Sequence, residues 1–203
     1  MRRLTLIRHA VTDWNSTGKL QGHLDCPLSD EGRRQARLLG ERVGESSVDL
    51  LYSSPLVRAH ETARTAFPHR EITVDRRLME LDFGEFQGRT PEENASMEEW
   101  QWWLEDPFAR RAPGGESYGE LRARAVEWFE ELPRLPHIVA VTHSGTIQML
   151  LSHIMGVEKP AWRKRIALRH SSISRLIFRG DDVLIERVND TRHVKSNIDP
   201  FLD

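Results

Sequence analysis

Short apolar segments alternate along this chain with longer amphipathic segments, and this alternation constrains the fold more than any other feature of the sequence. The apolar segments predict strands at residues 2–8, 48–54, 71–75 and 137–142. The amphipathic segments predict helices at residues 29–44, 54–67, 117–132 and 144–156. Neighbouring parallel strands need a crossover of about a dozen residues, which such helices supply. We therefore expect an α/β protein, a three-layer α/β/α sandwich with a mainly parallel sheet.

The C-terminal part of the sequence departs from this alternation. Residues 172–188 contain two apolar segments separated by a turn at Gly180–Asp182, which is the pattern of a β-hairpin. We expect this hairpin to give the sheet an antiparallel edge.

Residues that favour helix ends mark the predicted boundaries. Ser29 or Asp30 is suited to be the N-cap of the first helix. Ser54 is expected to cap the second helix, with Pro55 at its first position. The segment Ser117–Glu120 has the spacing of a capping box and predicts the start of the third helix.

The chain length favours one domain. A chain of 203 residues is most simply a single unit with one core, so we expect one domain over residues 1–203. The least regular part, at about residues 83–116, is expected to be an insertion that forms a lid or a subdomain over the functional site. Its large aromatic residues either cover that site or pack as a satellite core, and packing is their commoner use; they are Trp100, Trp102, Trp103 and Phe108.

Composition excludes several classes of function. The chain has 29 Lys and Arg against 31 Asp and Glu, a net charge of −2, so it has no general positive field to hold a nucleic acid. No apolar run approaches the roughly 20 residues that cross a bilayer, and the N-terminus has no secretory signal pattern. We expect a cytoplasmic protein with no nucleic-acid partner and no membrane partner.

Cysteine and histidine usage gives no indication of a metal. Cys26 is the only cysteine, which excludes an intramolecular disulfide and a thiolate cluster. No two histidines have helical i, i+4 spacing with an acid nearby. We therefore expect no metal site.

Cationic and titratable side chains follow the ends of predicted parallel strands. Arg8 and His9 end the first strand, and His143 follows the last parallel strand. Arg58 lies one turn into the second helix, from where its side chain can lean back toward the helix N-terminus. Ligands of open parallel sheets collect at this edge. Guanidinium groups and free N–H groups of a helix start suit a phosphoryl group there.

Five motifs of the sequence resemble, in the same order, those of the histidine phosphatase superfamily, also called phosphoglycerate-mutase-like. They are LIRHAVTDWN, GKLQGHLDCPLSDEGRRQA, SSPLVRAHETA, LMELDFGEFQG and VTHSGTI, and they extend from Leu6 to Ile147. The segments PGGESYGEL and NDTRHV are also similar to the family, so the resemblance covers roughly the whole chain. One motif alone is weak evidence, but five in order are specific. The resemblance implies the phosphoglycerate mutase-like fold.

Matched position by position, the resemblance implies a role for each motif residue. It implies His9 as the nucleophile that accepts the phosphoryl group, and Glu80 as the proton donor to the leaving oxygen. Asp82 and Glu85 are neighbouring acids that could be mistaken for Glu80. The residues that would bind the phosphoryl group are Arg8, Asn15, Gln21, Arg58, His143, Ser144 and Gly145.

The implied chemistry requires a neutral imidazole at His9, with one nitrogen free to attack phosphorus and the other N–H held by a carbonyl. Arg8 and Arg58 would disfavour the cationic imidazole, and they would stabilise the phosphoryl oxygens without a metal. Two positions differ from the family's commonest residue, which is glycine in both cases. Ala10 adds a methyl group beside the site, and the Ser144 hydroxyl would cap the helix or reach the phosphate.

The other histidines and most of the other basic residues are assigned to satisfied core positions or solvated helix faces. These assignments include His23, His170, Arg122 and Arg124.

The resemblance implies a metal-independent phosphatase without a cofactor, which hydrolyses a small phosphorylated metabolite through a phosphohistidine intermediate. The short interval from Glu80 to His143 is similar to that of the broad-specificity and α-ribazole phosphatases. The resemblance allows α-ribazole phosphate or 3-phosphoglycerate as substrate, and a monomer or a homodimer. One alternative is a bisphosphoglycerate-dependent phosphoglycerate mutase. Another is a non-catalytic phosphate-binding module, which would have lost a charged pocket residue.

Overall fold

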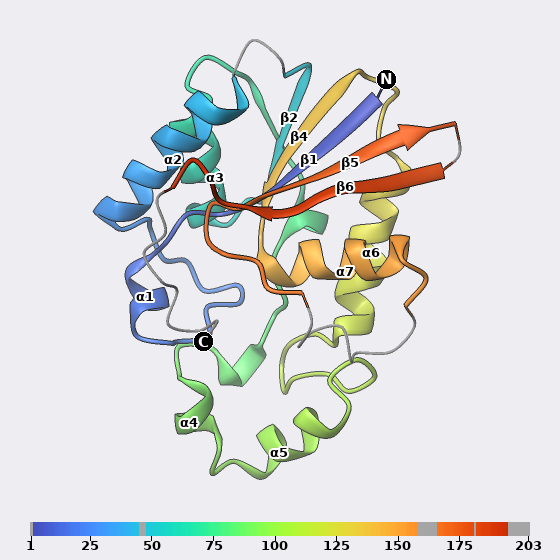
Figure 1. The fold of residues 1–203 in the computed structure, drawn as a ribbon. Coiled ribbons are helices and arrows are strands. Elements are labelled where there is room, and N and C mark those ends of the chain that lie inside the picture. Colours follow the sequence, from blue (N-terminus) through green and yellow to red (C-terminus); the bar gives the residue numbers. More distant parts are fainter. Residues whose placement is uncertain (1, 45–47, 158–165, 181, 195–203) are drawn as a thin grey trace.

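A six-stranded sheet with helices on both faces forms the centre of the molecule (Figure 1). The computed structural model describes residues 2–44, 48–157, 166–180 and 182–194. The strands lie in the order β3-β2-β4-β1-β5-β6, of which β5 and β6 are antiparallel to their neighbours and the others are parallel. They are β1 (Arg2–Arg8), β2 (Leu50–Ser53), β3 (Ile72–Val74), β4 (His137–Thr142), β5 (Ile173–Arg179) and β6 (Asp182–Asp190). The predicted α/β/α sandwich with an antiparallel edge is confirmed.

Helices α2 and α3 cover one face of the sheet, and α6 and α7 cover the other (Figure 1). The helices are α1 (Asp13–Ser16), α2 (Asp30–Val43), α3 (Val57–Ala66), α4 (Pro91–Asn94), α5 (Glu98–Glu105), α6 (Tyr118–Glu130) and α7 (Ser144–Ile154). Two short 3₁₀ helices, η2 (Arg76–Leu78) and η3 (Gly84–Phe86), lie in the connection between β3 and α4.

Two of the three predicted helix starts are confirmed. Ser29 caps α2 by accepting the N–H of Gly32, and Ser117 forms a capping box with Glu120 at the start of α6. The prediction for α3 was wrong, because that helix begins at Val57 and has no side-chain cap. The Ser54 hydroxyl accepts the N–H of Leu56 at 3.3 Å and lies 2.8 Å from a ring nitrogen of His143, so it serves a turn and a tertiary contact and not the helix start.

Strand β4 shows why the sheet is central to the core. All of its residues are buried. Ile138 and Ala140 pack against α6 and α7, whereas Val139 and Val141 pack against α2 and α3. A strand covered on both faces needs apolar residues at successive positions, as in parallel sheets generally.

The register of the central strands positions the residues that follow them. β1 and β4 are parallel neighbours in which Arg8 lies opposite Thr142, and the N–H of His9 donates to the Thr142 carbonyl at 2.8 Å. His9 and His143 therefore leave the sheet side by side. Ser54 follows β2 at the same edge, with its N–H bonded to the Val141 carbonyl at 3.0 Å.

Residues 83–116 contain α4 and α5, which lie at one end of the molecule (Figure 1). Trp100 and Trp103 are buried in a separate apolar cluster with Phe86 and Tyr118. Trp102 is 50% exposed, with the Arg110 guanidinium 4.8 Å from the centroid of its ring. Two of these tryptophans therefore build a satellite core.

Among the described residues no helix has the length and apolar character to cross a membrane.

Gly40 tests the packing of α2 against α3. A Cβ at this position would lie 2.2 Å from the carbonyl oxygen of Ala66 at the end of α3. Helix propensity alone would make Gly40→Ala stabilising by about 1 kcal/mol. We expect it instead to lower the free energy of unfolding in urea by about 1–3 kcal/mol, because a backbone carbonyl must move. Arg37→Ala, at an exposed position of α2, is the control; a more stable Gly40→Ala protein would contradict the prediction.

Candidate active site

His9 is buried directly after β1 and has a defined tautomer. Its Nδ1 lies 2.7 Å from the carbonyl oxygen of Ala10, and it is 4% exposed. Because a carbonyl can only accept, Nδ1 carries the hydrogen and Nε2 keeps its lone pair. The His9 ring centroid lies 5.2 Å from that of His143 and 5.6 Å from that of His170.

Burial and neighbouring cations keep His9 and His143 neutral. Desolvation is the largest cause that lowers the pKa of His9 well below its usual value, followed by the charge of Arg58. The same two causes, in the same order, lower the pKa of His143. Neutrality was expected from the arginines alone, whereas the structure gives burial the larger part.

Arg58 is held beneath the site by backbone carbonyls. It is 1% exposed on α3, and its two Nη groups donate to the carbonyls of Leu24 at 3.1 Å and Gly22 at 2.6 Å. Its Nε is buried without a hydrogen-bond partner in the described part of the chain. Desolvation lowers the pKa of Arg58 to about 10, so it stays cationic at neutral pH.

Arg8 is fixed by the segment that leads into β5. Its Nη1 donates to the Leu168 carbonyl at 2.5 Å, and its Nη2 donates to Nε2 of His170 at 2.6 Å. No role at the site was predicted for His170. The sequence did contain an indication of its position, because β5 was expected to be antiparallel. An antiparallel strand begins at the sheet edge where the parallel strands end, and His170 lies shortly before β5.

Glu80 lies in the loop between η2 and η3 and is 9% exposed. Its Oε1 accepts the N–H of Leu81 at 2.9 Å, and its Oε2 accepts the N–H of Gly145 at 3.2 Å. A Cβ on Gly145 would lie 2.2 Å from Oε1, so this glycine allows the carboxyl group to meet the start of α7. The Ser144 hydroxyl also reaches Oε2, at 3.4 Å, and does not cap the helix.

The neighbouring acid Asp82 points elsewhere. Its carboxylate accepts the N–H of Gly84 at 2.9 Å and lies 3.4 Å from a ring nitrogen of His23. Neither Asp82 nor Glu85 lines the cavity described next, whereas Glu80 does.

One cavity of about 170 Å³ brings nearly all of the predicted site residues together. His143 is the exception: it is fully buried beside His9 and does not line the cavity. The predicted residues that line it are Arg8, His9, Asn15, Gln21, Arg58, Glu80, Ser144 and Gly145. Lining residues without a predicted role are Lys19, Leu20, Gly22, Phe83, Tyr118 and Gln148.

Thr12 orients the two amide side chains of the cavity wall. Asn15 Oδ1 accepts the backbone N–H and the hydroxyl of Thr12, both at 2.9 Å. Gln21 Nε2 donates to the same hydroxyl oxygen at 2.9 Å. One threonine therefore links α1 to the segment that follows it.

Two larger hollows of the described surface, of about 670 and 640 Å³, lack these groups and share Phe129 and Val183. The first is lined by Arg2 and Pro136, at the opposite end of β1 and β4 from His9. In the described ranges no three His, Cys, Asp or Glu side chains are grouped to hold a metal ion.

Comparison with known protein sequences places these residues in a family. The profile of the Histidine phosphatase superfamily (branch 1) matches residues 4–191. "Phosphoserine phosphatase 1" of Hydrogenobacter thermophilus is 33% identical over 166 residues, 78% of each chain. "Probable phosphoglycerate mutase GpmB" of Salmonella choleraesuis is 35% identical over 100% of this chain and 98% of its own.

Solved structures show the same fold. The α-ribazole phosphatase of Shigella flexneri superposes with a TM-score of 0.85 at 25% identity, over 96% of this chain and 100% of its own. A phosphoserine phosphatase mutant of Entamoeba histolytica, in complex with phosphoserine, gives 0.83 at 26% identity, over the same shares. With the family profile matched over most of the chain, the protein belongs to branch 1 of the histidine phosphatase superfamily, as its five motifs predicted.

Proposed function

We propose that this enzyme is a metal-independent phosphatase that hydrolyses a small phosphomonoester through a phosphohistidine at His9. One observation carries the proposal. The Nδ1–H of His9 is bonded to the Ala10 carbonyl, which leaves the Nε2 lone pair unprotonated in a cavity lined by Arg8, Arg58 and Glu80. Such a nitrogen is a nucleophile at neutral pH, and the arginines supply the charge that a transferring phosphoryl group requires.

In the first half-reaction Nε2 of His9 attacks phosphorus, and the bond from phosphorus to the ester oxygen breaks. Glu80, in its protonated form, gives its proton to the leaving oxygen, so that an alcohol departs. Arg8 and Arg58 bind the equatorial oxygens, and the buried His143 supports the ring of His9 from 5.2 Å away. The product is a phosphohistidine with Glu80 ionised.

In the second half-reaction water replaces the alcohol. The Glu80 carboxylate takes a proton from the water as its oxygen attacks phosphorus, and the bond to Nε2 breaks. Phosphate leaves, Glu80 is again protonated, and His9 regains its lone pair. One carboxyl group therefore serves both steps.

The volume of the cavity favours a small substrate. A volume of about 170 Å³ holds a phosphoryl group with a modest organic group and is below the usual size of a site for drug-sized ligands. Relatives named as phosphoserine and α-ribazole phosphatases act on such phosphomonoesters. We also propose a cytoplasmic location, because charged metabolites of this kind do not cross membranes unaided.

Two alternatives have specific observations for or against them. The similarity to "Probable phosphoglycerate mutase GpmB" over the full chain favours a mutase as the second candidate. A non-catalytic phosphate-binding module is disfavoured, because the nucleophile, both arginines and the acid all line one cavity.

The phosphohistidine mechanism predicts that p-nitrophenyl phosphate is hydrolysed without added metal. His9→Ala should lose activity by at least about 10³-fold, because it removes the nucleophile. His153→Ala, which removes an imidazole from α7 outside the cavity, is the matched control and should stay within about twofold of wild type. Loss of activity in EDTA, or an active His9→Ala protein, would refute the mechanism.

A substrate assay separates phosphatase from mutase. With 3-phosphoglycerate the proposal predicts release of inorganic phosphate at a rate that 2,3-bisphosphoglycerate does not increase. A mutase would instead form 2-phosphoglycerate, and would do so efficiently only with the bisphosphate. Both products can be quantified in one reaction by phosphorus NMR, and efficient isomerisation would overturn the proposal.

The lowered pKa values of His9 and His143 predict how stability depends on pH. Each imidazole is neutral in the folded protein and takes up a proton in the unfolded chain below about pH 6.5. The contribution of these two neutral imidazoles to the free energy of unfolding is therefore complete above pH 6.5 and is lost as the pH falls below 6.5. His143→Asn should reduce the slope of unfolding free energy against pH, between pH 6 and 5, by about 1.4 kcal/mol per pH unit. The difference in unfolding free energy between wild type and His143→Asn at pH 8 gives the effect of the substitution apart from protonation. A slope unchanged by the substitution would contradict the prediction.

A further inference from the structure

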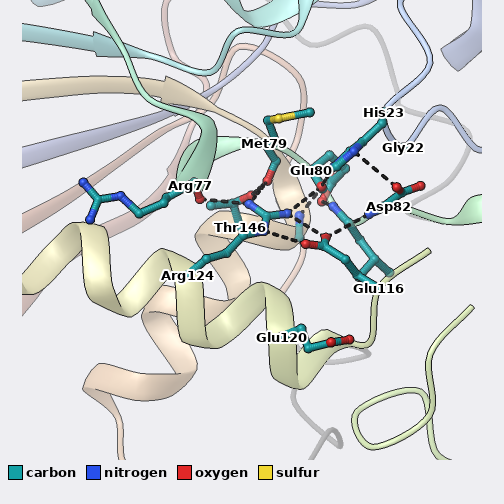
Figure 2. Close-up of polar contacts among 12 residues, drawn as sticks. Gly22, His23, Arg77, Met79, Glu80, Asp82, Glu116, Glu120, Arg124 and Thr146 are labelled. Carbon is teal, nitrogen blue, oxygen red and sulfur yellow. Dashed lines mark hydrogen bonds and ion pairs between the residues drawn. The ribbon is translucent and has the colours of Figure 1, made fainter. Parts of the chain in front are cut away.

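Arg124 makes five hydrogen bonds around the loop that carries Glu80 (Figure 2). It was predicted to lie on a solvated helix face, and that prediction was wrong. Its side chain is only 17% exposed. An arginine has five N–H donors, and all five are satisfied within the protein.

Two of these donors fix the guanidinium to Glu116. Nε donates to Glu116 Oε1 and Nη2 donates to Oε2, both at 2.9 Å, which is the bidentate geometry that fits arginine to a carboxylate. Burial alone would raise the pKa of Glu116, but the hydrogen bonds and charge of Arg124 outweigh burial and lower it. Glu116 Oε2 also accepts the N–H of Asp82 at 3.1 Å.

The other three donors bind backbone carbonyls on the N-terminal side of Asp82. Nη1 donates to the carbonyls of Arg77 at 2.9 Å and Met79 at 2.7 Å, and Nη2 donates to that of Glu80 at 2.7 Å. In the described part of the chain none of these three carbonyls accepts a hydrogen bond from a backbone N–H, so side chains satisfy them. Arg124 therefore holds the backbone up to Glu80, and Glu116 holds the backbone after it, at Asp82.

Helix α7 and His23 also bond backbone carbonyls of the loop, one carbonyl each. Thr146 Oγ1 donates to the Met79 carbonyl at 2.8 Å, and Nε2 of His23 donates to the Glu80 carbonyl at 2.8 Å. Among the described residues, Arg124 alone binds three carbonyls of the segment Arg77–Glu80. Since it has no donor left for a ligand, it acts on the site through the loop and not on substrate.

We propose that Arg124, anchored by Glu116, is a positioning residue that sets the place of the Glu80 carboxyl group for proton transfer. This inference rests on the proposed function, in which Glu80 is the proton donor. A shift of about 1 Å in a catalytic group can cost about a hundredfold in rate. The effect should therefore fall on the step that Glu80 serves.

The dependence on the leaving group distinguishes positioning from general structural damage. p-Nitrophenol is acidic enough to leave without a proton, whereas benzyl alcohol needs one, so only benzyl phosphate depends strongly on the acid. The value of kcat/KM reports the first phosphoryl transfer for both substrates. The ratio of kcat/KM for the two substrates is therefore a readout of Glu80, which a merely less stable protein would not change.

Arg124→Lys is the principal variant, because one ammonium cannot replace a planar fork with five donors. We expect kcat/KM for benzyl phosphate to fall by about 10- to 100-fold, with a change of no more than about threefold for p-nitrophenyl phosphate. Arg122→Lys is the matched control, since Arg122 lies on the same helix and donates to the Val157 carbonyl. It should leave both values within about twofold.

Two further variants keep the result interpretable. Glu116→Gln weakens the contact of Glu116 with Arg124 and should shift the ratio in the same direction. A urea titration shows whether each variant is folded. If Arg124→Lys is unfolded, Glu116→Gln still tests the proposal. Combining Arg124→Lys with Glu80→Gln should shift the ratio no further than Glu80→Gln alone, because residues that act through one group are not additive.

The outcomes separate the two proposals. If Glu80→Gln itself leaves the ratio unchanged, Glu80 is not the acid and that part of the proposed function is wrong. If Glu80→Gln shifts the ratio but folded Arg124→Lys and Glu116→Gln lower both substrates equally, the positioning role alone is refuted. An additive double variant would refute it as well.

Discussion

The parallel pairing of β1 with β4 is the interaction on which the rest of the structure depends. The last bond of that ladder joins the N–H of His9 to the Thr142 carbonyl, so it sets both the end of the sheet and the start of the site. The two strands lie in the middle of the sheet and carry apolar residues toward both helical layers. A shift of one residue in this register would turn those side chains to the wrong faces, so the core and the site are specified together.

The site that this pairing creates concentrates positive charge in a buried place. Arg58 is almost completely buried and keeps its charge, whereas the two neighbouring histidines lose theirs. Backbone carbonyls of Gly22, Leu24 and Leu168 take up guanidinium donors without neutralising them. This arrangement keeps the cations available to an anionic ligand, since an ion pair within the protein would have consumed their charge.

Much of this could be predicted from the sequence, because it depends on local patterns. Hydrophobic periodicity gave the strands and most helices, and the motifs indicated the residues that line the cavity. Ser54 and Arg124 were misassigned, and the contact of His170 with Arg8 was not predicted, because the partners are distant in sequence: a ring nitrogen of His143, the loop of Glu80 and the guanidinium of Arg8. A serine before a proline has the local pattern of a helix cap, and an arginine on a helix that of a solvated face. Only the fold shows what each one meets.

The contact between Arg8 and the segment before β5 has a consequence for the order in which the chain matures. Arg8 would leave a ribosome well before the Leu168 carbonyl and the His170 ring that hold it, which lie 160 and 162 residues further along the chain. A nascent chain could already form the pairing of β1 with β4 before that segment emerges. Arg8, which is proposed to bind phosphate, would stay unanchored until then, so the cavity of the proposed active site would be completed late in synthesis.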